Sequence, residues 1–361
     1  MSFLPKEVTD LALSHFQLDS PHVSCESYGC GHINNTQLVV TESGRRYILQ
    51  KISEQAFKDV PGLMENIQGV TEHLRKKAAV PENVLTLVPT HDGACYCHDE
   101  NGYWRLYDFV EHTVCLQAPE SDADFYESAV AFGQFQQDLA DFPVEKLHET
   151  IVNFHNTPDR YRIFHEVLDK DPMGRAKDVQ AEIDFVLARE QEAGAISQML
   201  QSGELPYRVT HNDTKLNNVL LDAKTGRGVC VIDLDTVMPG MAAYDFGDAI
   251  RFGASTAAED EHDLDQVDFS LEMFEAFARG VLREAGKTLT EREIELLPLG
   301  AKLITLEQGM RFLADYLNGD KYYKCTREGQ NLDRTRTQLK LVYLMEQHWD
   351  EMNRIIRNLK A

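Results

Sequence analysis

The first 112 residues alternate short apolar runs with turn-forming residues, which is the pattern of an antiparallel sheet. The expected strands cover residues 23–28, 37–41, 46–52, 84–88 and 103–110. Leu63, Ile67, Val70 and Leu74 recur every three or four positions, which predicts a helix over residues 62–77, and a shorter helix is predicted within residues 5–18. We therefore expect a β-rich N-terminal lobe at residues 1–112, ending in a hinge at about residues 106–112.

From residue 113 to residue 361 the apolar spacing is mostly helical. Phe125, Phe132 and Phe135 begin a stripe that is typical of a helix packed on a core. Helices are expected near residues 121–142, 179–186, 271–281, 290–317 and 342–359. One β-hairpin is expected within this part, with strands at residues 219–221 and 229–232. The fold class is therefore α+β, with a β-rich N-lobe and a mainly helical C-lobe.

Composition supports a folded enzyme-sized chain. The 361 residues are 43% apolar, enough for two lobes with a core, and no apolar run approaches the roughly 20 residues of a membrane span. Residues 1–7 lack the basic flank and apolar region of a secretory signal. We expect a cytoplasmic protein without a membrane partner, acting as a monomer or weak homo-oligomer.

The formal net charge is −23, which disfavours nucleic acid as a partner because binding needs basic residues to neutralise phosphates. Residues 311–340 are an exception, since seven basic and four acidic side chains give this segment a charge of +3. The segment is either a solvated basic face or a surface that contacts a substrate, and the sequence leaves both open.

The chain has seven cysteines, of which only Cys95 and Cys97 are close in sequence. A single C-x-C pair without a second pair does not make a zinc site. We expect reduced, mostly buried thiols.

Residues 209–222 carry the strongest chemical signal. His211, Asp213 and Asn218 stand in H-x-D-x-x-x-x-N spacing, and a later apolar run contains Asp233 and Asp235. In kinase-like folds the loop aspartate accepts the proton of the substrate hydroxyl, while an asparagine and a later aspartate hold Mg²⁺. Asp213 is therefore the candidate base, and Asn218 and Asp233 are the candidate metal ligands. Strand alternation predicts that Asp233 and Asp235 share one face.

Three further polar residues are given structural roles. His211 is expected to be buried and hydrogen-bonded, holding the catalytic loop. The run Tyr244–Asp248 resembles a metal-binding D-F-G, but Asp233 already occupies the position after the hairpin. Asp245, and with it Asp248, is therefore expected to bond the loop backbone near His211.

The N-lobe carries candidate nucleotide contacts. The turn at residues 28–36 contains G-x-G, and backbone N–H groups of such a turn can approach phosphates closely. In the strand at residues 46–52, Gln50 and Lys51 point to opposite faces, and the pattern leaves open which of them meets the nucleotide. The hinge backbone would meet the adenine. The candidate nucleotide contacts are Gly29, Gly31, Gln50, Asp108 and Val110.

These motifs together resemble the aminoglycoside phosphotransferase family, which includes choline, fructosamine and homoserine kinases. The similarity is greater to bacterial N-acetylhexosamine 1-kinases. It is carried by residues 31–34, 47–50, 209–221, 232–236, 250–255, 309–317 and 334–338.

The resemblance implies a bilobal protein-kinase-like fold and ATP- and Mg²⁺-dependent phosphorylation of the anomeric hydroxyl of N-acetylglucosamine or N-acetylgalactosamine. It implies Asp213 as base, with Asn218 and Asp233 on the metal. It places Gln50 where the broader family usually has a nucleotide-strand lysine. The implied sugar contacts are His32, Asn34, Phe252, Gly253, Arg311 and Tyr322.

Two other functions were considered. A kinase of the same fold could act on another sugar, an amino alcohol or an aminoglycoside. An aminoglycoside pocket should be acidic, which the basic segment containing Arg311 disfavours if it lines the pocket. A non-catalytic nucleotide-binding protein should have lost Asp213, Asn218 or Asp233, and the chain has all three.

Overall fold

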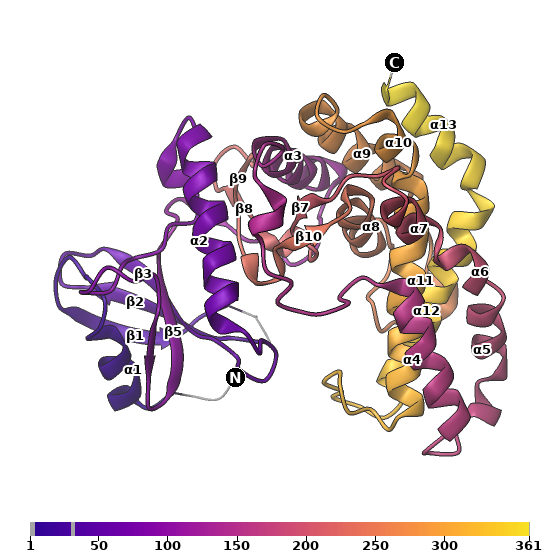
Figure 1. The fold of residues 1–361 in the computed structure, drawn as a ribbon, viewed down its shortest axis with the longest axis horizontal. Coiled ribbons are helices and arrows are strands. Elements are labelled where there is room, and N and C mark those ends of the chain that lie inside the picture. Colours follow the sequence, from indigo (N-terminus) through magenta and orange to yellow (C-terminus); the bar gives the residue numbers. More distant parts are fainter. Residues whose placement is uncertain (1–3, 30–32, 361) are drawn as a thin grey trace.

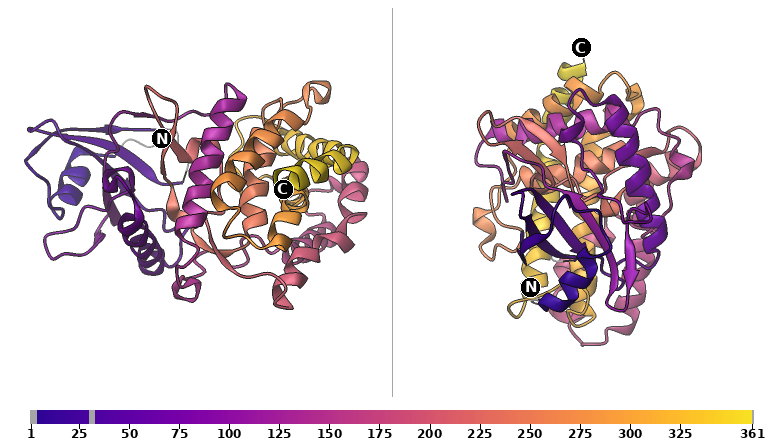
Figure 2. Two further views of the ribbon diagram at one scale, coloured as in Figure 1. Left: turned by 90° about the horizontal axis from the view of Figure 1, so that it is seen from above. Right: turned by 90° about the vertical axis from the view of Figure 1, so that its left-hand side faces the viewer.

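The computed structural model describes residues 4–29 and 33–360. A twisted antiparallel sheet forms one end of the molecule, and helices form the other (Figure 1). The sheet has the order β1-β2-β3-β5-β4. Its strands are β1 (His22–Ser27), β2 (Asn35–Thr41), β3 (Arg46–Lys51), β4 (Cys97–Asp99) and β5 (Gly102–Asp108). The view from above shows the same division into lobes (Figure 2, left).

The sheet has two different faces because its side chains alternate. Leu49, Trp104 and Leu106 pack under α1 (Lys6–Leu13). The opposite face carries Ile52 and Tyr107, which join α2 (Val60–Lys77) and side chains of the C-lobe in one hydrophobic cluster. Helix α2 therefore lies between the sheet and the helical lobe (Figure 1).

The C-lobe is mainly helical and also contains two small sheets. One pairs β7 (Arg208–Thr210) with β10 (Met238–Gly240), and the other has the order β6-β8-β9. These three strands are β6 (Thr113–Val114), β8 (Val219–Asp222) and β9 (Gly228–Val231). The helices are α3 (Asp122–Asp138), α4 (Thr157–Lys170), α5 (Gln180–Leu187), α6 (Glu190–Ala193), α7 (Ala195–Gln201), α8 (Ala242–Gly253), α9 (Leu271–Ala285), α10 (Glu291–Glu295), α11 (Leu297–Leu317), α12 (Gln330–Gln347) and α13 (Trp349–Lys360). The structure thus has the expected α+β class, with a β-sheet N-lobe and a helical C-lobe.

Capping bonds set the starts of α3 and α10, which lie close to the predicted helix starts at residues 121 and 290. The Ser121 side chain accepts the amide of Asp124 at the start of α3. Thr290 and Glu293 form a capping box at α10, in which each side chain accepts the other residue's backbone amide. These bonds satisfy amides that have no partner within the helix.

Three predicted elements differ from the structure. The helix expected at residues 290–317 is divided at Leu296 into α10 and α11. Residues 84–88 do not form a strand. Leu87 makes an isolated bridge to Tyr107 at the edge of β5, and Pro89, which has no N–H, cannot extend the ladder. The predicted helix at 342–359 is two helices, because the backbone leaves the helical conformation at His348. The apolar spacing continues through this bend, so periodicity alone could not reveal it.

The expectation that most cysteines are buried is wrong for the described part of the chain. Its six cysteines are free, and of these only Cys230 is buried. Cys25 and Cys97 lie on the edge strands β1 and β4, where one side remains open. In the described part of the chain, no helix is both long and apolar enough to cross a bilayer.

Helix α8 is buried along nearly its whole length and crosses α11 at glycines. A Cβ added at Gly247 would lie 2.5 Å from the carbonyl oxygen of Gly300, and one at Gly300 would lie 2.1 Å from that of Ala243. Both positions therefore require glycine, because backbone atoms cannot move aside as a flexible side chain can.

Gly247→Ala should destabilise the protein by about 1–3 kcal/mol, because the added methyl group overpacks this crossing. Denaturant unfolding measures the change. Gly69→Ala is the matched control, since a Cβ there would meet only the Phe142 ring, at an ordinary 3.5 Å. That control should be neutral or stabilising by about 0.5–1 kcal/mol, because alanine favours the interior of α2. Equal losses in both variants would contradict the proposed tight crossing.

Candidate active site

The candidate catalytic loop, residues 211–215, directly follows β7, and β7 is held in place by its pairing with β10. Thr210 at the end of β7 pairs with Met238 of β10. His211 is fully buried, its Nδ1 accepts the amide of Asp213 at 3.3 Å, and its Nε2 donates to the carbonyl oxygen of Ile232 at 2.9 Å. The imidazole thus ties the loop to the acidic turn that follows β9. The predicted structural role of His211 is confirmed.

Two carboxylates of α8 hold the loop backbone. Asp245 accepts the amides of His211 and Asn212, at 2.8 and 2.7 Å. Asp248 accepts the amide of Thr214 at 2.9 Å. These bonds confirm that Asp245 and Asp248 are structural. They also explain how Asn212 keeps a φ of 63°, in the left-handed region that asparagine tolerates better than most residues.

Asp213 lies between a cation and an amide. Its Oδ1 is 2.8 Å from Nζ of Lys215, and its Oδ2 accepts Nδ2 of Asn218 at 3.1 Å. Burial would raise the pKa of Asp213, but the neighbouring Lys215 ammonium holds that pKa below its ordinary value. Asp213 is therefore ionised at neutral pH, as a proton acceptor must be.

Asp233 occupies a tight turn directly after β9. Its φ of 60° is left-handed, and the next residues, Leu234–Thr236, form a 3₁₀ turn. The prediction that Asp233 and Asp235 share a strand face is wrong, because the strand ends at Val231 before either carboxylate. The turn directs the carboxylate of Asp235 to Arg105 and Asn34.

Asp233 keeps part of its surface open to solvent, but the protein packed around its carboxylate removes much of the carboxylate's hydration. Burial, followed by the negative charges of Asp235 and Asp213, raises the pKa of Asp233 to about 6. Three carboxylates thus gather around this turn, and a divalent cation would relieve their repulsion.

Asn218 and Asp233 fit a Mg²⁺ site by their chemistry. Asn218 uses its Nδ2 on Asp213, which leaves its Oδ1 as a possible ligand oxygen. The backbone oxygen of Asn218 accepts the amide of Ile232 at 2.9 Å, which brings this residue next to the acidic turn. Among the described residues no three His, Cys, Asp or Glu side chains form a metal cluster. A site with one carboxylate and one amide suits Mg²⁺ that takes its other ligands from water and phosphate.

The Gly-rich turn is only partly described. Gly31 and His32 lie outside the described residues. Gly29 has a φ of 76°, which favours glycine, and open space surrounds it. Asn34, predicted to contact sugar, instead donates from Nδ2 to Asp235 and accepts the amide of Ser53 at 3.0 Å. It thus links the turn after β1 to the C-lobe.

Gln50 and Lys51 take opposite faces of β3. Gln50 accepts Nε of Arg105 at 2.9 Å on the face that carries α2. Lys51 turns to the α1 face, with Nζ 5.8 Å from the Trp104 ring centre. Near the hinge, the amide of Asp108 donates to the Thr86 carbonyl, and the carbonyl of Val110 accepts the Thr113 hydroxyl.

The other predicted sugar residues, Phe252, Gly253, Arg311 and Tyr322, come from two regions of the C-lobe. Phe252 and Gly253 end α8, where Gly253 packs so closely on Phe125 that a Cβ would lie 2.2 Å from its ring. Arg311 of α11 donates to Gln308 at 3.1 Å and lies 5.7 and 5.8 Å from the ring centres of Phe154 and Tyr323.

The predicted sugar residue Tyr322 is 73% exposed, and its backbone amide donates to Asp315. Its ring meets that of Tyr323 edge-on, with the centroids 4.8 Å apart. Tyr323 thus links Tyr322 to Arg311.

The basic segment 311–340 does not form one surface. Arg327 pairs with Asp333 and Asp260, and Arg336 pairs with Glu182. These arginines are neutralised by fold contacts. Arg311 differs from them because it is surrounded by aromatic rings.

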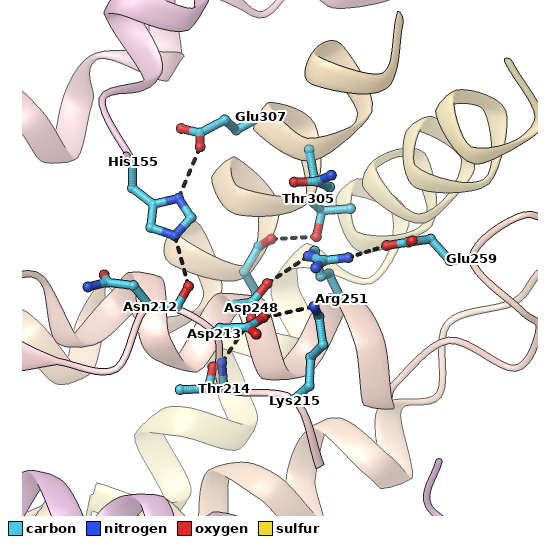
Figure 3. A network of polar contacts seen from close by, with 12 residues as sticks. His155, Asn212, Asp213, Thr214, Lys215, Asp248, Arg251, Glu259, Thr305 and Glu307 are labelled. Carbon is cyan, nitrogen blue, oxygen red and sulfur yellow. Dashed lines mark hydrogen bonds and ion pairs between the residues drawn. The ribbon is translucent and has the colours of Figure 1, made fainter. Parts of the chain in front are cut away.

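A second set of polar contacts supports the loop from the side of α11 (Figure 3). His155 lies 3.0 Å from Glu307 of α11 through Nδ1 and 3.3 Å from the carbonyl oxygen of Asn212 through Nε2. On the side of α8, Arg251 bridges Asp248 and Glu259, at 2.8 and 2.7 Å (Figure 3). The loop carrying Asp213 is therefore held from α8 and α11.

Sequence reasoning missed several of these residues. Lys215 could have been found, because it lies two residues after Asp213 in a polar loop. Arg105 and His155 have no local signal. Their partners lie far along the chain, as Arg105 and Asp235 show.

The arrangement combines an ionised carboxylate, an adjacent ammonium and two side-chain oxygens of the type that binds a divalent cation. A hydroxyl placed at Asp213 could lose its proton to that carboxylate while a phosphoryl group is held at the metal side. These are the elements of phosphoryl transfer to an alcohol.

Comparison with known proteins supports this geometry. Residues 25–285 match the model of the phosphotransferase enzyme family. This range contains both the catalytic loop and the acidic turn.

Similar solved structures share the fold over nearly the whole chain. A microcompartment-associated aminopropanol kinase is 16% identical, with a TM-score of 0.61, over 97% of this chain and 99% of that one. An aminoglycoside phosphotransferase from Alicyclobacillus acidocaldarius is 13% identical, with a TM-score of 0.62, over 99% and 98%. An amicoumacin kinase, solved with AMP-PNP, Ca²⁺ and amicoumacin, is 14% identical, with a TM-score of 0.58, over 94% and 93%.

Proposed function

Since the chain belongs to the phosphotransferase enzyme family, we propose that it is an ATP- and Mg²⁺-dependent kinase of N-acetylhexosamines. It transfers the γ-phosphoryl group of ATP to the anomeric hydroxyl of N-acetylglucosamine or N-acetylgalactosamine. The products are the sugar 1-phosphate and ADP. The cytoplasm, where ATP is available, is the compartment that we propose.

The observation that carries the phosphoryl-transfer part is the grouping around Asp213. Its carboxylate is ionised beside Lys215 and bonded to Asn218. The negative charge of Asp213 also contributes to the raised pKa of Asp233. Asp213 would accept the proton of the hydroxyl as the new O–P bond forms and the bond to ADP breaks. An anomeric hydroxyl is more acidic than an ordinary alcohol, so a carboxylate with a lowered pKa can still serve as its base.

Asn218 and Asp233 would hold Mg²⁺, which neutralises charge on the phosphates when bound. Lys215 keeps Asp213 ionised and places a positive charge where the transferred phosphoryl group meets the acceptor. Gln50 and the turn at Gly29 and Gly31 would border the nucleotide, with the backbone of Asp108 and Val110 at the adenine.

The sugar part of the proposal is supported by the surroundings of Arg311. Its guanidinium lies beside two aromatic rings, and the neighbouring Arg160 has an Nε without a hydrogen-bond partner among the described residues. The charge of Arg311 also lowers the pKa of Arg160, after the larger effect of burial. Two adjacent arginines repel an ammonium substrate and can donate to hydroxyl and acetyl oxygens.

Kinases of the same fold act on amino alcohols and antibiotics, and a substrate of that kind is the alternative. A panel of free sugars, amino alcohols and aminoglycosides with MgATP, followed by ADP release, decides between them. Phosphorus NMR of the product should show an anomeric phosphate. Turnover of amines but not of N-acetylhexosamines would contradict the proposal.

Arg311→Ala should lower kcat/KM for the sugar by about 10- to 100-fold, because a charged hydrogen bond contributes roughly 1.5–3 kcal/mol. The KM for ATP and the unfolding midpoint should change little. Lys324→Ala, an exposed cation of the same basic segment, is the matched control and should leave the sugar dependence unchanged. An unchanged sugar dependence in Arg311→Ala would place the sugar pocket elsewhere.

A further inference from the structure

On the face of the sheet that meets the C-lobe, the cation of β3 is Arg46, which pairs with Glu111 at the hinge end of the strand and not with the acidic turn. Gln50 occupies that face, while Lys51 lies on the α1 side near Trp104. The cation that reaches the acidic turn comes instead from β5, where Arg105 stands directly across from Gln50 in the sheet.

Arg105 is an unusual residue for its position, since it is 1% exposed and therefore loses its hydration. Its Nε donates to Oε1 of Gln50 at 2.9 Å, and its Nη1 pairs with the carboxylate of Asp235. The guanidinium carbon lies 5.3 Å from the Tyr107 ring centre. The described residues bond this guanidinium at Nε and Nη1. The N–H groups of Nη2 therefore remain available as donors.

The Arg105–Asp235 pair crosses between the lobes. Arg105 belongs to the N-lobe sheet, while Asp235 lies two residues after Asp233 in the acidic turn. Burial opposes the charge of Arg105, but Asp235 outweighs it and raises the pKa of Arg105, with a smaller contribution from Asp233. Arg105 thus pairs with a carboxylate of the acidic turn, while Lys215 pairs with Asp213 of the catalytic loop in the other lobe.

A nucleotide bound between these lobes brings several negative charges, and arginine matches phosphate oxygens with paired donors. We propose that Arg105 is the N-lobe cation that binds the phosphates of the nucleotide, in place of a lysine on β3. Asp235 and Gln50 hold the guanidinium in position before the nucleotide enters. This inference rests on the proposed function and adds a residue to its nucleotide site.

The competing explanation is that Arg105 only ties the lobes together through Asp235. The two explanations differ for Asp235→Asn. If Arg105 binds phosphate, removing the carboxylate leaves its charge available to the nucleotide. If Arg105 acts only through the pair, Asp235→Asn and Arg105→Met should weaken binding alike.

The experiment measures the Kd of ADP and of adenosine by calorimetry in EDTA, so that no metal contributes. Arg105→Met should weaken ADP binding by about tenfold or more and leave adenosine binding unchanged, because only ADP carries phosphates. Asp235→Asn should bind ADP as well as wild type or better. Lys51→Met, the matched control on the other face of the sheet, should match wild type.

Several results would overturn the inference. Arg105→Met could lose affinity for ADP and adenosine equally, or lose no affinity for ADP. Asp235→Asn or Lys51→Met could also lose as much ADP affinity as Arg105→Met does. If Arg105→Met does not fold, Arg105→Lys takes its place, because it keeps the charge but loses the paired donors. It should weaken ADP severalfold, and an unchanged ADP affinity would overturn the inference. A wild-type chain that binds no ADP would overturn the proposed function itself, whereas the other results concern only Arg105.

Discussion

Asp213→Asn should lower kcat by about 10² to 10⁴-fold while nucleotide binding stays close to wild type. The amide has the size of the carboxylate and can still accept from Asn218, so the loop should keep its shape. It cannot accept a proton at neutral pH, and it no longer pairs with Lys215. Single-turnover rates with saturating MgATP and sugar measure the chemical step, and calorimetry with ADP measures binding.

The matched control for this variant is Asp222→Asn at the end of β8. That carboxylate accepts the amides of Lys224 and Thr225 in an exposed hairpin turn and lies outside the site. Its kcat should remain within about twofold of wild type, as for most surface substitutions. If Asp213→Asn retained near-normal turnover, Asp213 would not be the base.

Asp233→Asn should lower activity at ordinary Mg²⁺ concentrations by at least about 100-fold, since even indirect partners of a metal ligand contribute 10- to 100-fold. Asparagine tolerates the left-handed φ of 60° at this position, so the turn should survive the substitution. The affected quantity is the affinity for the metal. The Mg²⁺ concentration for half-maximal activity should therefore rise, and high Mg²⁺ should restore part of the rate.

Two measurements separate this effect from a general loss of structure. Binding of ADP in EDTA should not weaken in Asp233→Asn, because no metal takes part in it. The unfolding midpoint should not fall, since the substitution removes a carboxylate that Asp235 and Asp213 repel. An unchanged Mg²⁺ dependence would remove Asp233 from the metal site and leave Asn218 without its proposed partner ligand.

The two variants together test different halves of the site. Asp213→Asn should alter the chemical step at every Mg²⁺ concentration, whereas Asp233→Asn should alter mainly the dependence on Mg²⁺. A similar Mg²⁺-independent loss in both would mean that the loop and the turn act as one structural unit, and the separate roles would be wrong.

Features that depend on neighbouring residues were predictable from the sequence. The hairpin of β8 and β9, the capping box at Thr290 and the division into a β-rich and a helical lobe all follow from local periodicity and turn chemistry. The structural roles of His211 and Asp245 were also predictable. Both residues form hydrogen bonds that hold the loop at residues 211–215, and the motif spacing in the sequence had already identified that loop.

Predictions failed where backbone direction changed without a change in periodicity. Asp233 and Asp235 follow an apolar run, so alternation placed them on one strand face, yet a left-handed turn separates them. The bend at His348 leaves the apolar stripe in phase and is equally invisible in the pattern. Both failures concern φ and ψ at one residue, which composition does not report.

The sequence by itself determined where the residues of the proposed chemistry stand, because Asp213, Asn218 and Asp233 are placed by the spacing of one loop and one hairpin. Only the tertiary structure decided what surrounds that chemistry. Arg105 meets Asp235 across 130 positions of the chain, and it stands on the C-lobe side of the sheet only because β5 pairs with β3 in that register. Such partners are selected by the packing of one lobe on the other, and the burial that makes their charges matter arises only when both lobes are folded.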